Sequence, residues 1–304
     1  MLILVLCFTG CQSTGEVEDG KLSIVATSFP HYDFARQITK GNDNVEIKML
    51  ISPGSEVHTY EPTPADILAV SDCDLFIYTG GESDTWAKGI LGSAKEDGRR
   101  VISFMDICAP DGNAIHEGED GHGHSHGEVY DEHVWTNPVM AMALAEHIYY
   151  GLCEIDKENE ALYKQNLDAF LSGLSKVDEA LKNVSEESVR DCIIVADRFP
   201  FYHLAVHYGI EYEAAYPGCS SSTEPSAAII ASLSRKVREE NIPYVFTIEF
   251  SNGKIANNVI SGTDAKILTL HSCQNVSAGD FDRGVTYIDL MMCNADFLRK
   301  ALCE

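Results

Sequence analysis

Basic residues are scarce in this chain. Its 22 lysines and arginines stand against 47 aspartates and glutamates, which gives a formal net charge of −25 at pH 7. Nucleic acids are held by basic patches, so this balance argues against a nucleic-acid partner, whereas it suits the attraction of cations. Long apolar runs are also lacking after the first residues, since none approaches the roughly 20 residues that a membrane helix requires.

Several sequence motifs are missing as well. None of the ten cysteines lies in a CxxC pair, which argues against a zinc ribbon and favours disulfides in an exported chain. No HExxH, GxSxG or Walker motif occurs, and Glu61, three residues after His58, lies beside prolines that predict a rigid loop. We therefore expect a protein that is not an enzyme.

A glycine- and acid-rich stretch is the most informative feature present. Residues 116–133, HEGEDGHGHSHGEVYDEH, carry five histidines among 18 residues. Imidazole is the commonest protein ligand of zinc and related metals, and glycine lets the segment adapt to the ion. The stretch indicates metal handling, with a disordered polar loop as the alternative. Its His-rich part, residues 116–127, is expected to collect or sense zinc weakly.

The N-terminus is typical of an export signal. Residues 2–8 are almost purely apolar and lead into TGC at 9–11, the arrangement of a bacterial lipoprotein signal. Residues 1–20 are predicted to be a signal peptide with a lipobox and tether, in which Cys11 becomes the lipidated first residue; the alternative is a plain signal peptide cut nearby. We expect a soluble, monomeric mature chain that is extracytoplasmic and lipid-anchored to the cell membrane, or periplasmic.

Strands and helices are predicted to alternate. Apolar, β-branched runs predict strands at 21–28, 45–50, 75–78, 100–104, 192–196, 211–215, 244–248 and 266–270. Helical spacing of apolar residues predicts helices at 29–39, 64–70, 86–91, 140–152, 159–183, 227–240, 256–260 and 287–302. Such alternation implies parallel sheets with crossover helices, which bind ligands at the carboxyl ends of their strands.

The helix at 159–183 contains no proline and would be about 37 Å long, enough to bridge two domains. The predicted fold class is therefore α/β, with two α/β lobes of parallel sheet joined by a long rigid backbone helix. The lobes are expected at 21–152, which includes the His-rich loop, and at 185–304, with the linking helix at 153–184. A ligand is expected in the cleft between them, and the stiff helix predicts small tilts on binding in place of wide hinge closure.

Four histidines outside the His-rich loop lie where predicted strands end. They are His58, His133, His203 and His271. Separations near 70 residues exclude a local zinc finger but suit a site assembled from several loops of two lobes. We predict that these four histidines form the metal site.

Two segments resemble those of a known family. HTYEPTPAD at 58–66 and DEHVWTNP at 131–138, with the His-rich loop, the long helix and the lipoprotein-like start, resemble the metal-binding solute-binding lipoproteins of zinc/manganese ABC importers, a zinc-uptake, ZnuA-like family. The resemblance covers essentially the whole mature chain. It implies that His58 and His133 are the first-lobe ligands of a transported divalent metal ion, Zn²⁺ with Mn²⁺ as the alternative. It also implies delivery of the ion to an ABC-transporter membrane permease; a metal-buffering surface adhesin is the competing interpretation.

The second lobe departs from the family pattern. Arg198, which cannot bind a metal, stands where the resemblance implies a ligand. Either His203 or His271 could then supply the next ligand, with His271 preferred for its position at a strand end, and Glu249 or Gln274 could supply an oxygen or a supporting hydrogen bond. A third nitrogen would favour zinc over manganese.

Two cysteines of the second lobe lie near these residues. Cys219 and Cys273 both fall in predicted loops, so a disulfide between them is one expectation. A Cys273 thiolate that binds zinc beside His271 is the other.

Overall fold

The computed structural model describes residues 20–93, 98–108, 131–216 and 224–304. The predicted lipobox at Cys11, the His-rich loop 116–127 and Cys219 lie outside the described residues. The expectations for the lipobox and for the His-rich loop therefore stay predictions.

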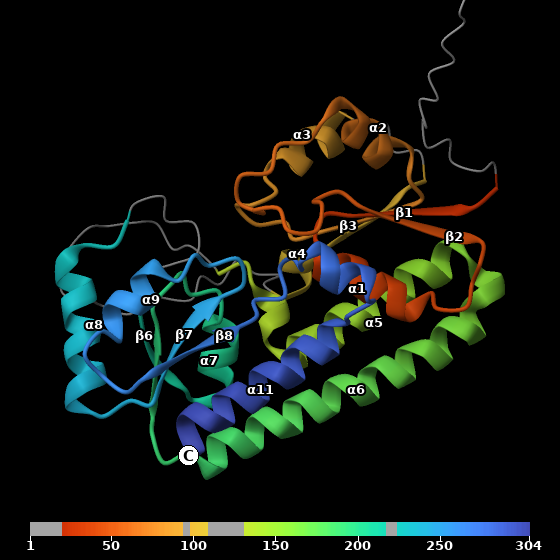
Figure 1. Cartoon of the computed structure of the whole chain (residues 1–304). Helices are drawn as coiled ribbons and strands as arrows, with labels where there is room; N and C mark the ends of the chain where they lie inside the picture. Colours follow the sequence, from red (N-terminus) through yellow and green to blue (C-terminus); the bar gives the residue numbers. More distant parts are fainter. Residues whose placement is uncertain (1–19, 94–97, 109–130, 217–223) are drawn as a thin grey trace, which may run out of the picture.

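The first lobe is built on a parallel sheet of order β2-β1-β3-β4. Its strands are β1 Leu22–Ala26, β2 Val45–Met49, β3 Leu75–Tyr78 and β4 Arg100–Ser103. Its helices are α1 Phe29–Ile38, α2 Pro64–Asp72, α3 Trp86–Ser93 and α4 Phe104–Cys108. Helices α2 and α3 cover one face of the sheet and α1 the other (Figure 1). Alternate residues of β1 explain this, because Ile24 packs on the α1 side and Val25 on the α2 side.

The second lobe repeats the arrangement with a parallel sheet of order β6-β5-β7-β8. Its strands are β5 Cys192–Val195, β6 Glu211–Ala214, β7 Tyr244–Ile248 and β8 Lys266–Leu270. Its helices are α7 Tyr202–Tyr208, α8 Ala227–Glu239, α9 Lys254–Val259 and the short α10 Ala278–Asp282. Helices α8 and α9 lie on one side of this sheet, and the long helices of the molecule lie on the other (Figure 1).

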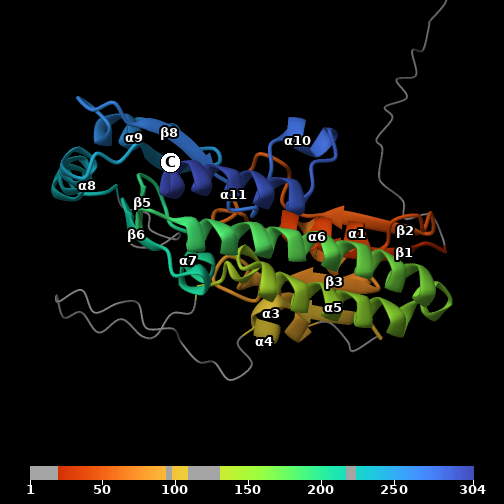
Figure 2. The same cartoon turned by 90° about the horizontal axis from the view of Figure 1, so that it is seen from below.

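Two long helices lie across both lobes, α6 Glu160–Glu187 and α11 Tyr287–Cys303. A third, α5 Pro138–Ile155, packs against the first lobe and against α6. A short 3-10 turn, η2 Lys157–Asn159, separates α5 from α6. Helix α6 has 28 residues and runs along both sheets (Figure 2). Its buried side chains recur every three or four residues from Tyr163 to Val184, which fits the amphipathic pattern read from the sequence. The predicted fold class, two parallel α/β lobes joined by a long helix, is confirmed.

One large apolar cluster runs through both lobes, beside a smaller cluster within each lobe. It contains Ile24 and Phe34 of the first lobe together with Phe246 of β7 and Met291 of α11. Hydrogen bonds also join the lobes, because the Asn275 side-chain amide donates to the main-chain oxygens of Ser52 and Ser55, each at 2.9 Å. Pulling the lobes apart would expose this core, so the structure gives a physical reason to expect small tilts. Comparison of solution scattering with and without metal tests that expectation.

The structure tests the expectation of disulfides and shows the length and apolar content of the described helices. The seven described cysteines are all unbridged, so the prediction of disulfides is wrong for this part of the chain, and because Cys273 is among them the expected bridge from Cys219 to Cys273 is wrong as well. Cys73 and Cys273 instead lie in apolar clusters, where a free thiol packs as a small hydrophobic side chain. Across the described ranges, no helix has the length and apolar content to cross a bilayer.

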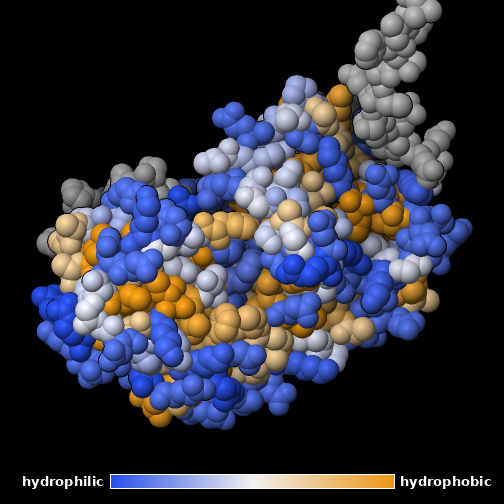
Figure 3. All heavy atoms as spheres, viewed as in Figure 1, coloured by the Kyte–Doolittle hydropathy of each residue, from blue (hydrophilic) through white to orange (hydrophobic). Residues whose placement is uncertain are grey.

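The molecular surface follows the acidic composition. Hydrophilic residues cover most of the face in Figure 3, and apolar residues form patches, among them one over the second lobe. Scattered exposed apolar residues are ordinary on a folded protein. The surface therefore does not identify a ligand site. The side chains between the lobes are the better candidates.

Candidate metal centre

His58 lies in the loop that follows β2. The Leu50 amide continues the sheet by donating to the Ala26 carbonyl oxygen at 2.9 Å, and Val57 is buried. At the far end Thr63 caps α2, where its hydroxyl accepts from the Asp66 amide at 3.2 Å. The loop is thus anchored at both ends, and it holds His58 with only 13% of its side chain exposed.

His133 belongs to a short loop that enters α5 through the 3-10 turn η1 Val134–Thr136. The Asp131 carboxylate accepts from the His133 amide at 2.8 Å and faces its Nδ1 at 3.0 Å. A carboxylate oxygen only accepts, so Nδ1 carries the hydrogen and Nε2 carries the lone pair with which imidazole binds a metal. Burial alone would raise the pKa of Asp131, but its pairing with His133 holds that pKa below the usual value.

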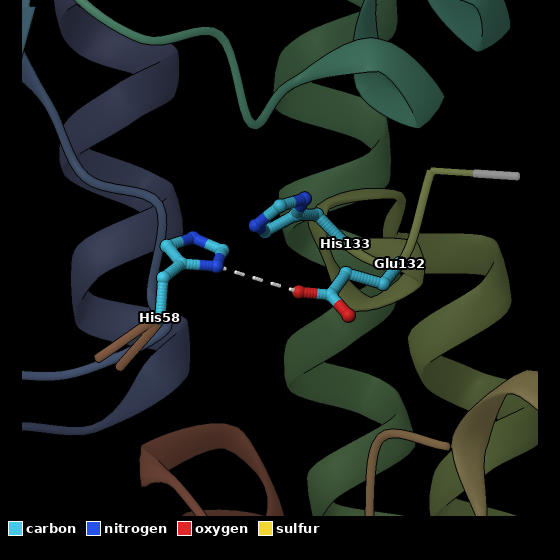
Figure 4. Close-up of side chains that lie close together, drawn as sticks. All are labelled: His58, Glu132 and His133. Carbon is cyan, nitrogen blue, oxygen red and sulfur yellow. Dashed lines mark ion pairs between the residues drawn. The ribbon is translucent and has the colours of Figure 1, made fainter. Parts of the chain in front are cut away.

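His58, Glu132 and His133 converge on one point. Among the described residues they form a group of three potential ligands in which the ligand atoms lie within 4.8 Å of one another (Figure 4). His58 Nδ1 lies 3.8 Å from Glu132 Oε1, and the two imidazole rings are 5.9 Å apart between centroids. Ligands about 2.0–2.2 Å from a tetrahedral zinc lie roughly 3.3–3.5 Å from each other, so modest side-chain movement would close this group around an ion.

Glu132 is the member that the sequence did not single out. Its neighbour Asp131 pairs with His133, and only the turn at His133 brings both Glu132 and His133 to the same side. The one available signal was an acidic residue next to a predicted ligand. Such a residue is common on an acidic surface, and the sequence could not distinguish it from a solvated one.

The loop after β3 holds Glu132 in place. Glu132 Oε2 accepts from the Ser83 amide at 3.0 Å, and a Cβ added to Gly81 would lie 2.6 Å from the Glu132 Cβ and would also strike Oε2. Asp84 stabilises the same loop by accepting from the Thr79 amide at 2.7 Å. Burial, with a smaller contribution from nearby Glu132, raises the pKa of Asp84 to about 7. Glycine at position 81 is therefore what lets Glu132 approach this loop.

We expect Gly81→Ala to weaken metal binding by about 10-fold, because the new methyl group must displace Glu132 from the cluster. Isothermal titration with zinc measures this. The matched control is Gly92→Ala, since an added Cβ there meets nothing within 4 Å. Wild-type affinity in Gly81→Ala would show that Glu132 does not contribute to the site.

His203 and His271 lie outside this cluster. His203 Nε2 is 2.8 Å from the main-chain oxygen of Asp131, and burial lowers the pKa of His203. His271 Nδ1 accepts from the Cys273 amide at 3.1 Å and lies 3.8 Å from Glu249 Oε1. The structure thus brings two of the four predicted histidines together. As ligands, all four stay predictions.

A small cavity of about 30 Å³ opens beside His58 between the lobes. The second lobe lines it with Arg198, Glu249 and Gln274. Glu249 is fixed there, because Oε2 accepts from the Ser272 amide at 2.8 Å and Oε1 accepts from the Ser272 hydroxyl. The cavity has room for an ion and its immediate ligands but not for an organic solute of ordinary size.

Arg198 pairs across the cleft with Glu56 of the first lobe, Nη1 to Oε2 at 3.2 Å. The guanidinium thus closes the side of the cavity where a ligand was expected. The described lining of the cavity carries two carboxylates, Glu56 and Glu249, and the Arg198 guanidinium, and Glu132 beside His58 adds a third carboxylate, so the charges of these four side chains sum to −2. A divalent cation would neutralise them.

The Cys273 thiol is poorly suited to bind zinc. It is fully buried in the shared core, and burial raises its pKa well above the usual value. Such a thiol resists conversion to the thiolate that binds zinc.

Cys273 and Phe250 both have positive φ angles, 59° and 62°, at the ends of β8 and β7, so backbone strain concentrates near this cavity.

Comparison with known proteins identifies a family. A family model described as "Zinc-uptake complex component A periplasmic" matches residues 24–301. The zinc-binding lipoprotein AdcA of Streptococcus pneumoniae R6 is 30% identical over 304 residues, which cover 99% of this chain and 60% of that relative. The high-affinity zinc uptake system protein ZnuA of Bacillus subtilis 168 is 28% identical over 315 residues, with 99% of this chain and 97% of that relative covered. This chain therefore spans about 60% of the pneumococcal relative's length and nearly all of the other.

The fold is also similar to that of a solved structure. The crystal structure of the Zn(II)-bound ZnuA-like domain of Streptococcus pneumoniae AdcA matches with a TM-score of 0.76 and 27% identity, covering 94% of this chain and 100% of that domain. The family model spans both sheets and all three long helices. The chain belongs to the family of zinc-uptake complex component A proteins.

Proposed function

We propose that this chain captures Zn²⁺ outside the cytoplasm and delivers it to the membrane permease of an ABC importer. The observation that carries the proposal is the convergence of His58, Glu132 and His133 beside the cavity between the lobes. Relatives named as zinc-binding and zinc-uptake proteins support the same conclusion. Zinc is here the cargo, and the chain is a transport component rather than an enzyme.

The ligand chemistry favours zinc over manganese. Two imidazoles and one carboxylate are a common zinc ligand set, whereas manganese prefers a shell richer in oxygen. Glu249 and Gln274 are the second-lobe side chains placed to add an oxygen ligand from across the cavity. Arg198 would then bind no metal and would instead hold Glu56 over the site.

Capture in this proposal needs little movement. The three first-lobe ligands come from two loops that are anchored by β2 and α5, and the shared core opposes a wide opening. The ion would enter through the cleft, replace repulsion among the carboxylates with attraction, and draw the ligand atoms together. Lipidation at Cys11 would keep the protein close to the permease, and the His-rich loop would raise the local zinc concentration.

A metal-buffering adhesin remains the alternative, and it would rely on the His-rich loop instead of the cluster. The described cluster favours capture, because a buried and preorganised group suits a single tight site. Deleting residues 117–127 separates the two functions. The capture proposal expects one tight zinc site to survive the deletion, and loss of that site would contradict it.

Metal titration tests the proposal directly. The full mature chain, freed of metal, is titrated calorimetrically with Zn²⁺ and with Mn²⁺, and its metal content after purification is measured. We expect one tight zinc site and at least about 100-fold weaker manganese binding, since Zn²⁺ lies above Mn²⁺ in intrinsic affinity for imidazole sites. Equal affinities would favour the manganese importer, and the absence of a tight site would favour the buffer.

A further inference from the structure

His203 makes a buried contact between the lobes. It lies on α7 of the second lobe, is 3% exposed, and places Nε2 2.8 Å from the main-chain oxygen of Asp131 in the first lobe. A carbonyl oxygen only accepts hydrogen bonds, so Nε2 must carry a hydrogen. That nitrogen then has no lone pair for zinc, so His203 could bind the ion only through Nδ1.

The residue held by this contact is the one that orients His133. The Asp131 carboxylate lies 3.0 Å from His133 Nδ1 and 3.9 Å from His203 Nε2. Asp131 thus stands between a proposed ligand and a histidine of the opposite lobe. A carboxylate that accepts a hydrogen bond from the ring nitrogen that does not bind the metal fixes the orientation and tautomer of a ligating histidine.

We propose that His203 is a positioning residue: it holds Asp131 from the second lobe and thereby fixes His133 in the orientation that binds zinc. This inference rests on the proposed function, because it takes His133 as a ligand. It also links affinity to the arrangement of the lobes. A partner that drew α7 away from the loop at residues 131–133 would release Asp131, loosen His133 and lower zinc affinity.

The alternative is that His203 is itself a ligand, and two substitutions separate these roles. In His203→Gln the side-chain amide can still donate to the Asp131 carbonyl, whereas His203→Leu removes the donor and keeps the bulk. Helix α7 offers a matched control in His207→Leu, since His207 is an exposed histidine one turn further on.

We expect His203→Leu to weaken zinc binding about 10-fold, the lower end of the range for residues that orient a ligand. His203→Gln should stay within about 2-fold of wild type because the hydrogen bond is kept. The visible absorption spectrum of the Co²⁺-loaded proteins should be alike in all of them, because the ligand set does not change. A His203→Gln variant with a weakened site and an altered Co²⁺ spectrum would make His203 a ligand. Wild-type affinity in His203→Leu would remove its positioning role.

A measurement on the wild type keeps the inference testable if a variant does not fold. Nitrogen-15 NMR reports the tautomer of each histidine, and we expect the hydrogen of His203 on Nε2 both without metal and with zinc. A zinc-bound nitrogen at His203 would overturn the inference. If the wild type binds no zinc tightly, the proposed function fails, while the tautomer in the metal-free protein still shows whether the His203 contact with Asp131 exists.

Discussion

Replacing His133 by alanine is expected to weaken zinc binding by more than about 100-fold, beyond the 10–100-fold that loss of an orienting partner costs. His133 is 2% exposed and is held through Nδ1 by Asp131, so its replacement removes a proposed ligand together with the side-chain contact to Asp131 that orders the loop. His58→Ala should have a similar effect, because its ring faces Glu132 in the same cluster. Isothermal titration in competition with a chelator measures the change.

His147→Ala is the control for these variants. His147 lies exposed on α5, where Nδ1 is 2.8 Å from the Ala143 main-chain oxygen, and it is not part of the cluster. Thermal unfolding gives a second readout, since a ligand present at 1,000 times its dissociation constant stabilises the folded state by about 4 kcal/mol. Zinc should raise the melting temperature of wild type and His147→Ala but not of His133→Ala. Unchanged affinity in His133→Ala would place the tight site elsewhere in the chain.

His31 should make the free energy of unfolding of the metal-free protein sensitive to acid. It is completely buried in the first lobe, where Nδ1 lies 2.9 Å from the Ser28 hydroxyl, and burial lowers its pKa to about 3. The unfolded chain protonates His31 near its usual pKa of 6.5, so between pH 6.5 and about 3 the unfolded state binds one more proton than the folded state. The contribution of the His31 imidazole to the free energy of unfolding is fully present above pH 6.5 and is lost as the pH falls through that window. The loss is roughly 1.4 kcal/mol per pH unit, or about 4–5 kcal/mol in total.

Denaturant unfolding of wild type and His31→Gln at several pH values checks this expectation. Between pH 6.5 and 4, the slope of the free energy of unfolding against pH should be smaller in the variant than in wild type, by up to the contribution of one proton. The difference between the two proteins isolates His31 from Asp84, whose raised pKa acts with the opposite sign below about 7. Identical pH slopes would mean that His31 is protonated in the folded protein. His147→Gln, at an exposed position, should leave the slope unchanged.

Much of the architecture could be predicted from local patterns. The strands at 75–78, 244–248 and 266–270 were predicted with the bounds that the structure has, because short apolar runs between turn residues fit buried parallel strands. The long helix was recognisable from its apolar spacing. Helices α4, α7 and α10 were missed, since five to seven residues are too few to establish a helical period.

The family resemblance was also visible in the sequence and is confirmed by the family model and the relatives. The motifs around His58 and His133 lie in loops next to regular elements, so their positions at the cleft followed from the alternation of strands and helices. Disulfides were expected from the cysteine count, and this was wrong for the seven described cysteines. Composition and compartment suggest disulfides but do not bring two sulfur atoms within bonding distance.

The sequence by itself determined the two-lobed α/β class, the long helix and the loops that carry His58 and His133, because periodicity and strand ends are local properties. Only the tertiary structure decided that Glu132 joins those histidines, that Gly81 makes room for it and that Arg198 pairs with Glu56. It also decided that His203 faces a carbonyl oxygen. These contacts join residues 49 to 142 positions apart, and their geometry depends on how the loops of both lobes pack, which no local pattern encodes.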